Sequence, residues 1–389
     1  MRSSTSSSEP VETPRLHAVA QPPVHYVHRD VPARNWLAMA GVALLLTAGA
    51  LALWEHHVRT LGYEPDYDDT TSLWALQRQR LVGADVSQWA LVGDSRTLFD
   101  LDLDALETAI GLRPVQLATV GSNPIVIMTH LAEDPSFAGT LFVGVTPPLL
   151  AAPGGPPIEN PRRYVRKYRE WSPANAWEAM LSRPLQEQFA FIQAEDLTLK
   201  QLILSLPWPV REGAFAPKLP PHFSQIDLDR RTRMIERVET DQAFREHIRA
   251  TWPPLFQGPP RPAVLSEEVW AKMFADGWTA NIARAKQNAD AIRARGGRVI
   301  FVRMPSSGPL RELEDRVAPR DTHWERLLRE TGVPGIHYLD YPELSGFICP
   351  EHSHLSASDS VKFTENLIAV LKREGLFAPR GEGAPERSP

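Results

Sequence analysis

A single uncharged segment near the start of the chain constrains how the rest can fold. Residues 36–54 read WLAMAGVALLLTAGALALW, in which Thr47 is the one hydroxyl-bearing side chain. A helix of about 19 residues rises roughly 28 Å, which matches the hydrocarbon core of a bilayer. Trp36 and Trp54 would lie at the two membrane interfaces. The sequence therefore predicts one transmembrane helix over residues 36–54.

The residues on either side of this segment predict its orientation. Residues 1–35 are rich in Ser and Pro and lack periodic apolar residues, which predicts a disordered cytoplasmic tail. Arg29 and Arg34 precede the segment, whereas an acidic run at residues 64–69 follows it. The positive-inside rule then predicts a single-pass inner-membrane protein whose main domain is periplasmic. A cleaved signal peptide is the alternative, but no small-residue cleavage pattern precedes Glu55.

Composition limits the classes of function. The chain has 43% hydrophobic and 23% charged residues, as a globular domain with a substantial core requires. Its net charge of -5 gives no reason to expect a nucleic-acid partner, and no cofactor is predicted. One cysteine, Cys349, excludes an intramolecular disulfide. We interpret it as a small buried hydrophobe rather than a catalytic nucleophile.

Short apolar runs alternating with helical patterns predict an α/β fold with an open, doubly wound parallel sheet. The expected strands are residues 89–92, 115–120, 140–145, 298–302 and 336–339. The expected helices are residues 104–110, 124–130, 267–295, 310–330 and 357–373. In such sheets, ligands bind beyond the carboxyl ends of the strands.

The alternation is interrupted by a proline-rich stretch, which divides the domain in two. The predicted organisation is a tail (1–35), a transmembrane helix (36–54), a juxtamembrane linker (55–87), a first α/β part (88–149), a helical insertion or cap (150–266), a second α/β part (267–375) and a tail (376–389).

Two of the strand ends carry residues suited to nucleophilic catalysis. Ser95 follows the first strand at a turn into a helix, where its hydroxyl is exposed and backbone N–H groups can bind an oxyanion. A serine nucleophile needs a base within hydrogen-bond reach. His354 lies just before the last helix, three residues after Glu351, which could orient its ring. Asp94 is interpreted as a structural residue that bonds the turn backbone.

These residues together resemble the SGNH/GDSL superfamily of serine esterases and acyltransferases. Gly93-Asp94-Ser95 is similar to the first block of that family, and Glu351-x-x-His354-Leu355 to its last block. Gly121 falls where the second block supplies an oxyanion glycine. The resemblance covers about residues 88–150 and 267–374. It implies a flavodoxin-like three-layer α/β sandwich, with Ser95 as nucleophile, His354 as base and Glu351 orienting it.

Membrane-anchored members of the family offer the nearest parallel, namely those that accompany alginate O-acetylation and teichoic-acid D-alanylation. They too carry one N-terminal span, and Arg often stands where Arg96 does here. The resemblance implies an esterase or O-acyltransferase that acts on acyl or acetyl groups of a cell-envelope polysaccharide. Its partners would be the inner membrane, the acylated polymer and a membrane acyl-donor protein.

Two departures leave alternatives open. The acidic residue is Glu351 where the family usually has Asp. The third block, Gly144-Val145-Thr146-Pro147, lacks the usual oxyanion Asn. The predicted oxyanion donors are Ser95 and Gly121, with Asn123 as a substitute for the missing residue. The runner-up function is a weak or inactive scaffold in a polysaccharide-modification complex, and the third is a lipid-directed esterase.

Three further features are open to two interpretations. Arg96 and Arg303 could bind an anionic or carbohydrate substrate, and an ordinary ion pair is the alternative for Arg303. His352 and His354 have the spacing of half a metal site, but no partner cluster is visible, so no metal is expected. The basic segment at 162–171, with aromatics at helical spacing, could meet lipid headgroups or an anionic glycan, or pack those aromatics on the core.

Overall fold

The computed structural model describes residues 35–83, 86–192, 203, 206, 209, 220–257 and 261–377. The chain divides into two compact units, Met1–Leu53 and Trp54–Pro389. Helix α1 (Trp36–Thr60) begins in the first unit, and it is long and apolar enough to cross a membrane. Its most apolar stretch is not buried in the protein, which is consistent with single-pass anchoring. The predicted N-terminal tail lies outside the described residues except for Asn35.

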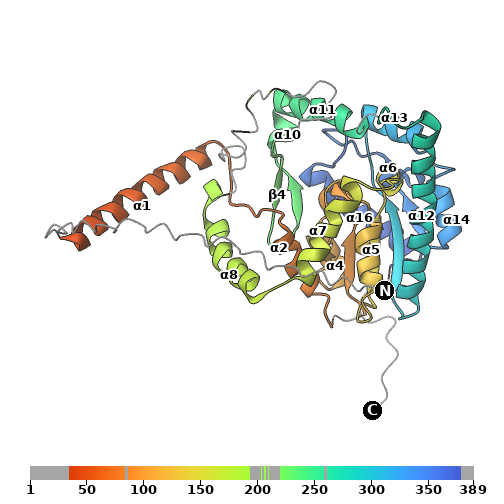
Figure 1. Cartoon of the computed structure of the whole chain (residues 1–389), viewed down its shortest axis with the longest axis horizontal. Coiled ribbons are helices and arrows are strands. Elements are labelled where there is room, and N and C mark those ends of the chain that lie inside the picture. Colours follow the sequence, from red (N-terminus) through yellow and green to blue (C-terminus); the bar gives the residue numbers. More distant parts are fainter. Residues whose placement is uncertain are drawn as a thin grey trace, which may run out of the picture. The chain divides into compact units, whose positions relative to one another are not determined.

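A five-stranded parallel sheet forms the centre of the second unit (Figure 1). Its strands are β1 (Trp89–Val92), β2 (Val115–Gln116), β3 (Thr140–Gly144), β6 (Arg298–Arg303) and β7 (Gly335–His337). They lie in the order β2-β1-β3-β6-β7, so that, counted along the chain, the order is 2-1-3-4-5. This is one of the two common orders of doubly wound sheets. The predicted α/β fold with a parallel sheet is therefore confirmed.

The edge strand β2 is shorter than the predicted 115–120. Nevertheless, the N–H groups of Leu117 and Thr119 still donate to the carbonyls of Leu91 and Gly93, at 2.8 and 3.0 Å. The chain therefore continues alongside β1 toward the carboxyl end of the sheet.

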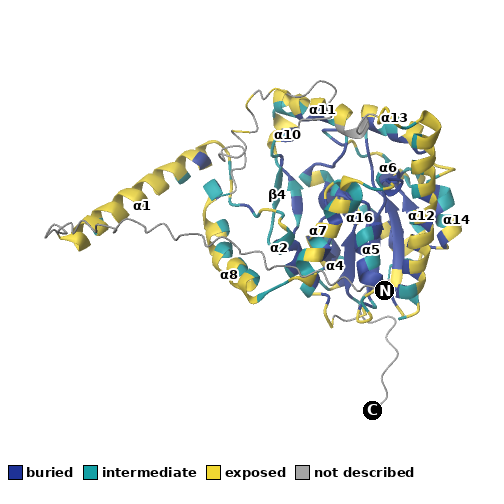
Figure 2. Cartoon of the chain, viewed as in Figure 1, coloured by how far each residue is buried: buried dark blue, intermediate teal, exposed yellow. Residues whose placement is uncertain are grey.

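Helices cover both faces of the sheet because successive strand side chains point to opposite sides. Ala90 and Val92 pack in one cluster, and Trp89 and Leu91 in the other. The first cluster includes side chains of α2 (Thr71–Gln79), α5 (Ile125–Ala132), α12 (Glu267–Arg293) and α14 (Trp324–Thr331). The second includes side chains of α4 (Leu103–Ile110) and α16 (Ala357–Arg373). Figure 2 shows the resulting buried layer along the strands.

Local signals mark several helix ends as predicted. Gly111 closes α4 in a left-handed conformation with φ 76°, and the Ser356 side chain accepts from the N–H of Asp359 at the start of α16. The single helix predicted over 310–330 is wrong, because the segment forms α13 (Gly308–Val317) and α14. Pro319 lies between them, and it has no N–H with which to continue the first helix.

Part of the predicted linker 55–87 belongs to the folded domain. Helix α2 lies within it, and Trp74 is fully buried in the core. The Trp74 Nε1–H donates to the carbonyl of Leu117 at 2.9 Å. At the other end, Leu376 and Phe377 of the predicted tail pack on the core, and residues 378–389 lie outside the described ones.

Described parts of the proline-rich insertion at 150–266 pack on this α/β core within the second unit. Its described elements are α6 (Pro147–Leu150), which opens it, α7 (Pro156–Arg169), α8 (Pro173–Gln188), η1 (Ala190–Ile192), β4 (Ser224–Ile226), β5 (Thr232–Met234), α10 (Arg237–Thr240) and α11 (Gln242–Gln257). The remaining elements are α3 (Ser95–Phe99), η3 (Tyr338–Asp340) and α15 (Pro342–Ser345).

Arg230 attaches the antiparallel β4–β5 hairpin to the edge of the sheet. Its side chain is fully buried, and it bonds both carboxylate oxygens of Asp69 at 2.6 and 2.8 Å. It also donates to the carbonyls of Gln116 and Ala118, at 2.9 and 2.8 Å. These carbonyls lie at the edge strand, so one side chain joins the insertion to the carboxyl end of the sheet, where the predicted catalytic residues lie.

Candidate active site

The Ser95 turn follows β1 directly and requires a glycine. A Cβ at Gly93 would lie 1.9 Å from the Oγ1 of Thr97 and 3.3 Å from the Cα of Gly144. Neither contact can be relieved by a small shift, because Thr97 is itself fully buried between the two glycines. Asp94 caps α3, and its Oδ1 accepts from the N–H of Arg96 at 3.1 Å. This bond matches the structural role expected of Asp94.

Ser95, His354 and Glu351 form a continuous hydrogen-bonded chain. The Oγ of Ser95 lies 2.8 Å from Nε2 of His354, although the two residues are 259 positions apart in sequence. The Nδ1 of His354 lies 2.9 Å from Oε1 of Glu351. With the ring proton on Nδ1, the Nε2 lone pair faces the serine hydroxyl, as a general base requires. Glu351 and His354 are buried, and Ser95 is half-buried.

The loop before α16 folds tightly enough for a glutamate to reach the histidine. Oε1 of Glu351 accepts from the backbone N–H groups of both Ser353 and His354. His352, between Glu351 and Ser353, has a positive φ of 82°, and its carbonyl accepts from the N–H of Ser307 at 2.9 Å. The longer side chain thus folds back over its own loop, which accounts geometrically for Glu351 standing where an aspartate was expected.

Trp252 is a member of this site that the sequence did not indicate. Its Nε1–H donates to Oε2 of Glu351 at 2.6 Å, so both oxygens of this buried carboxylate are engaged. Helix α11, which carries Trp252, also binds the loop through Arg249, whose guanidinium donates twice to the carbonyl of Pro350. The helix comes from the proline-rich insertion, where no strand pattern marks the position.

Three aromatic side chains surround the His354 ring. The ring centroids of Phe99, Phe223 and Trp252 lie 4.4, 5.9 and 6.1 Å from that of His354. Phe99 comes from α3, whereas Phe223 directly precedes β4 in the insertion. Burial among such rings excludes water from the base and fixes the plane of the imidazole.

The predicted oxyanion donors lie at neighbouring strand ends. The backbone N–H groups of Ser95 and Gly121 donate to no acceptor among the described residues. Gly121 has φ 62°, a conformation that favours glycine. Asn123 differs, because its buried amide donates to the carbonyl of Leu150 at 3.2 Å and accepts from the N–H of Ile125 at 3.0 Å. Its side chain therefore holds the loop together rather than presenting an unoccupied amide.

Arg96 and Arg303 share one buried carboxylate, that of Glu314 on α13. Arg96 Nη2 lies 2.6 Å from Oε1, and Arg303 pairs with Oε2, which also accepts from Ser306 Oγ at 2.9 Å. Burial raises the pKa of Glu314, but the guanidiniums of Arg303 and Arg96 outweigh it, and the pKa falls to about 2. Both arginines are buried, so the ion pair expected as the alternative for Arg303 is present.

Cys349 is fully buried, and burial raises the pKa of its thiol well above the usual range. This fits the interpretation as a buried hydrophobe, because the thiolate is the reactive form. Around His352, as elsewhere in the described part of the chain, no three His, Cys, Asp or Glu side chains gather as metal ligands would.

No protein-family model matches this sequence, and no curated protein matches it.

Proposed function

We propose that this chain is a membrane-anchored serine esterase or O-acyltransferase that works through an acyl-serine intermediate. The observation that carries the proposal is the chain of two hydrogen bonds, Ser95 Oγ to His354 Nε2 at 2.8 Å and His354 Nδ1 to Glu351 at 2.9 Å. A nucleophile, a base and a group that orients the base are the three parts that acyl transfer by a serine requires.

The first half-reaction makes the acyl-enzyme. Ser95 Oγ attacks the ester carbonyl carbon while His354 Nε2 takes the hydroxyl proton, and Glu351 stabilises the imidazolium that results. The carbonyl oxygen becomes an oxyanion, for which the N–H groups of Ser95 and Gly121 are available. When the ester C–O bond breaks, His354 returns the proton to the leaving alcohol, and the acyl group remains on Ser95.

The second half-reaction decides between hydrolysis and transfer. His354 removes a proton from water or from a sugar hydroxyl, whose oxygen attacks the acyl-serine carbonyl. Ser95 then leaves with the proton, and a free acid or a new ester is formed. We propose acyl or acetyl groups of a cell-envelope or secreted polysaccharide as the substrate. The support is the resemblance to anchored SGNH proteins and the 2-1-3-4-5 strand order, which flavodoxin-like sheets share.

We further propose that α1 anchors the domain on the periplasmic side of the inner membrane, where a membrane protein could supply the acyl group. An alkaline phosphatase fused after the C-terminus should then be active in cells, and alkaline carbonate should leave the chain in the membrane fraction. An inactive phosphatase together with an active cytoplasmic reporter at the same position would contradict this orientation.

A fluorophosphonate probe tests the nucleophile. Full-length protein in detergent should be labelled on the peptide that contains Ser95, and Ser95→Ala should abolish the labelling. Ser136→Ala, which removes an exposed serine hydroxyl elsewhere, should leave it unchanged. A folded protein that is not labelled would favour the inactive scaffold. The hydrogen bond from the Asn123 amide to the carbonyl of Leu150 favours that alternative, because it occupies the amide expected to replace the missing oxyanion donor.

A further inference from the structure

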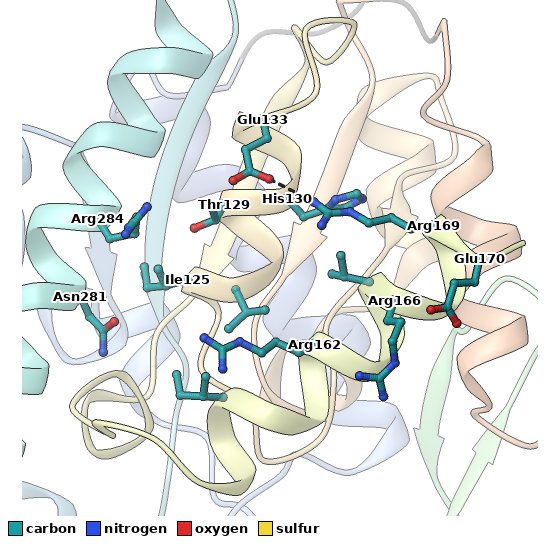
Figure 3. A pocket seen from close by; sticks show the side chains of 13 residues that line it. Ile125, Thr129, His130, Glu133, Arg162, Arg166, Arg169, Glu170, Asn281 and Arg284 are labelled. Atoms are coloured by element: carbon teal, nitrogen blue, oxygen red, sulfur yellow. Dashed lines mark hydrogen bonds and ion pairs between the residues drawn. The ribbon is translucent and has the colours of Figure 1, made fainter. Parts of the chain in front are cut away.

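A second site lies outside the catalytic residues, in a cleft of about 620 Å³ between α5, α7 and α12 (Figure 3). Ser95 does not line it. Side chains from all three helices do, and Figure 3 shows Arg162 on α7 and Arg284 on α12 among them. We call this space the arginine cleft.

The lining of the arginine cleft is positively charged, although the whole chain carries -5. Four guanidiniums face two carboxylates, which leaves a net charge of +2: Arg162, Arg166, Arg169 and Arg284 against Glu133 and Glu170. The three arginines of α7 recur at intervals of four and three residues, so they share one side of that helix. All four arginines are exposed.

Two of these guanidiniums have no carboxylate partner among the residues that the structure describes. Arg169 pairs with Glu133 at 3.1 Å, and Arg162 pairs with Glu159 at 2.6 Å. Arg166 and Arg284 form no ion pair with any residue that the structure describes. A planar guanidinium binds carboxylate with two parallel hydrogen bonds, so the two side chains are available for an anionic ligand.

The aromatic side chains on and just after α7 do not fit the role of a membrane anchor. Tyr164 and Tyr168 on the helix, and Trp171 two residues beyond its end, pack against the core cluster. The Tyr164 ring lies 6.0 Å from that of Trp74, and Arg78 lies over the Tyr168 ring at 4.9 Å. A helix lying in a membrane interface would present such rings outward beside its cations. The inward aromatics and the concave shape favour a polymer chain over a lipid surface.

The arginine cleft begins next to the proposed oxyanion loop. Ile125, at its start, opens α5 four residues after Gly121, and the lining follows α5 to Glu133. Eight helical residues span roughly 12 Å, about the length of two sugar units. Asn123 and Asn281, on the loop and on α12, both donate to the carbonyl of Leu150, at 3.2 and 2.7 Å. The loop and the cleft wall are thereby held together.

We propose that the arginine cleft binds a linear anionic glycan that carries carboxylate groups, and that it holds the polymer on which Ser95 acts. The second clause rests on the proposed function, whereas binding itself does not require Ser95.

Calorimetric titration of the full-length protein in neutral detergent with an oligogalacturonate probe tests the binding. We expect saturable binding that weakens as salt is added, because exposed charges are screened. Arg166→Ala combined with Arg284→Ala should weaken it about tenfold, since each exposed contact contributes modestly. Arg163→Ala is the matched control, an exposed arginine of α7 outside the cleft, and it should leave the affinity unchanged.

Glu133→Gln should act in the opposite direction. It releases Arg169 from its ion pair, so binding should tighten about twofold. If the glycan were bound only by the overall positive charge of α7, Arg163→Ala would lower the affinity as much as Arg166→Ala.

Three outcomes would overturn the proposal: no binding of the oligogalacturonate, equal binding by the double variant, or equally strong binding of a linear polyphosphate at the same site. Aryl acetate hydrolysis in the same samples separates this inference from the proposed function. Turnover without glycan binding refutes the cleft alone, whereas glycan binding without turnover refutes the serine chemistry alone.

Discussion

The α/β core and the insertion at 150–266 both reach the active site, but they contribute different parts of it. Loops at the carboxyl ends of core strands carry Ser95 and Gly121, and the loop before α16 carries His354. Among its described residues, the insertion contributes no member of the hydrogen-bonded chain Ser95–His354–Glu351. It supplies Trp252, which bonds the far oxygen of Glu351, and Phe223, which packs beside His354.

The core therefore carries the residues proposed to react, whereas the insertion carries residues that position them. The core sets the 2.8 Å contact between Ser95 and His354, the proposed nucleophile and base, which any serine mechanism of this kind needs. The insertion surrounds that contact. The indole N–H of Trp252 donates to the buried carboxylate of Glu351, and the rings of Phe223 and Trp252 pack beside His354. Substitutions in the core should therefore abolish the reaction, whereas substitutions in the insertion should weaken it.

The largest effects are expected for the two residues proposed to react. Ser95→Ala and His354→Ala should each lower kcat for an aryl acetate by at least about 10³-fold, because each removes an obligatory part of one proton-transfer unit. The double variant should be little worse than either single variant. Steady-state rates and circular dichroism of the three proteins provide the check, and losses that multiply would mean that the two residues act independently.

A large effect on stability is expected from the core residue Glu314. Glu314→Gln leaves two buried guanidiniums without their shared charge, which should lower the free energy of unfolding by about 3–5 kcal/mol. Urea titrations followed by tryptophan fluorescence measure this. Glu325→Gln breaks an exposed pair with Arg320, and as a control it should cost less than about 1 kcal/mol.

The Glu314 effect should also depend on pH. Because its folded pKa is lowered from 4.5 to about 2, the carboxylate stabilises the fold fully above about pH 4.5 and less as the pH falls toward 2. The stability gap between the natural protein and Glu314→Gln should therefore be largest near neutral pH and shrink in acid. A gap that stays constant across this range would show that the charge of Glu314 is not what stabilises the cluster.

A smaller effect on catalysis is expected from the insertion. Trp252→Phe keeps an aromatic ring but removes the N–H that binds Glu351, and a hydrogen bond to a charged group is worth about 1.5–3 kcal/mol. We expect kcat to fall roughly tenfold with KM little changed, because Trp252 positions the base and does not bind the substrate. Trp270→Phe is the matched control, because this ring lies on α12 and packs against Phe274 of the same helix. Equal rates for the two variants would show that Trp252 does not position His354.

The same two regions differ in how far the sequence predicts them. The bounds of β1 and α16 follow from the sequence to the residue, because buried apolar runs and a capping serine mark them locally. Ser95, Glu351 and His354 stand beside these elements and were predicted with them. Parallel sheets bind ligands beyond the carboxyl ends of their strands, and this rule depends on the sheet alone. It therefore also predicted that the loops carrying Ser95 and His354 meet.

The contacts of the insertion could not be predicted in this way. Trp252 and Arg230 act through partners about a hundred or more positions away, and neither lies in a periodic pattern that would indicate its direction. Trp74 was missed for a related reason, because a short helix next to a membrane segment gives no sign that it packs under a sheet. The burial of Arg96 depends on Glu314, which is 218 residues away.

Trapping the acyl-enzyme would show whether Ser95 is the nucleophile. Full-length protein should be mixed with an aryl acetate, quenched in acid within the first turnovers, digested and examined by mass spectrometry. We expect one acetyl group, carried by Ser95, and its absence in Ser95→Ala. Ester turnover with no acetylated peptide, or with the acetyl group on another residue, would contradict it.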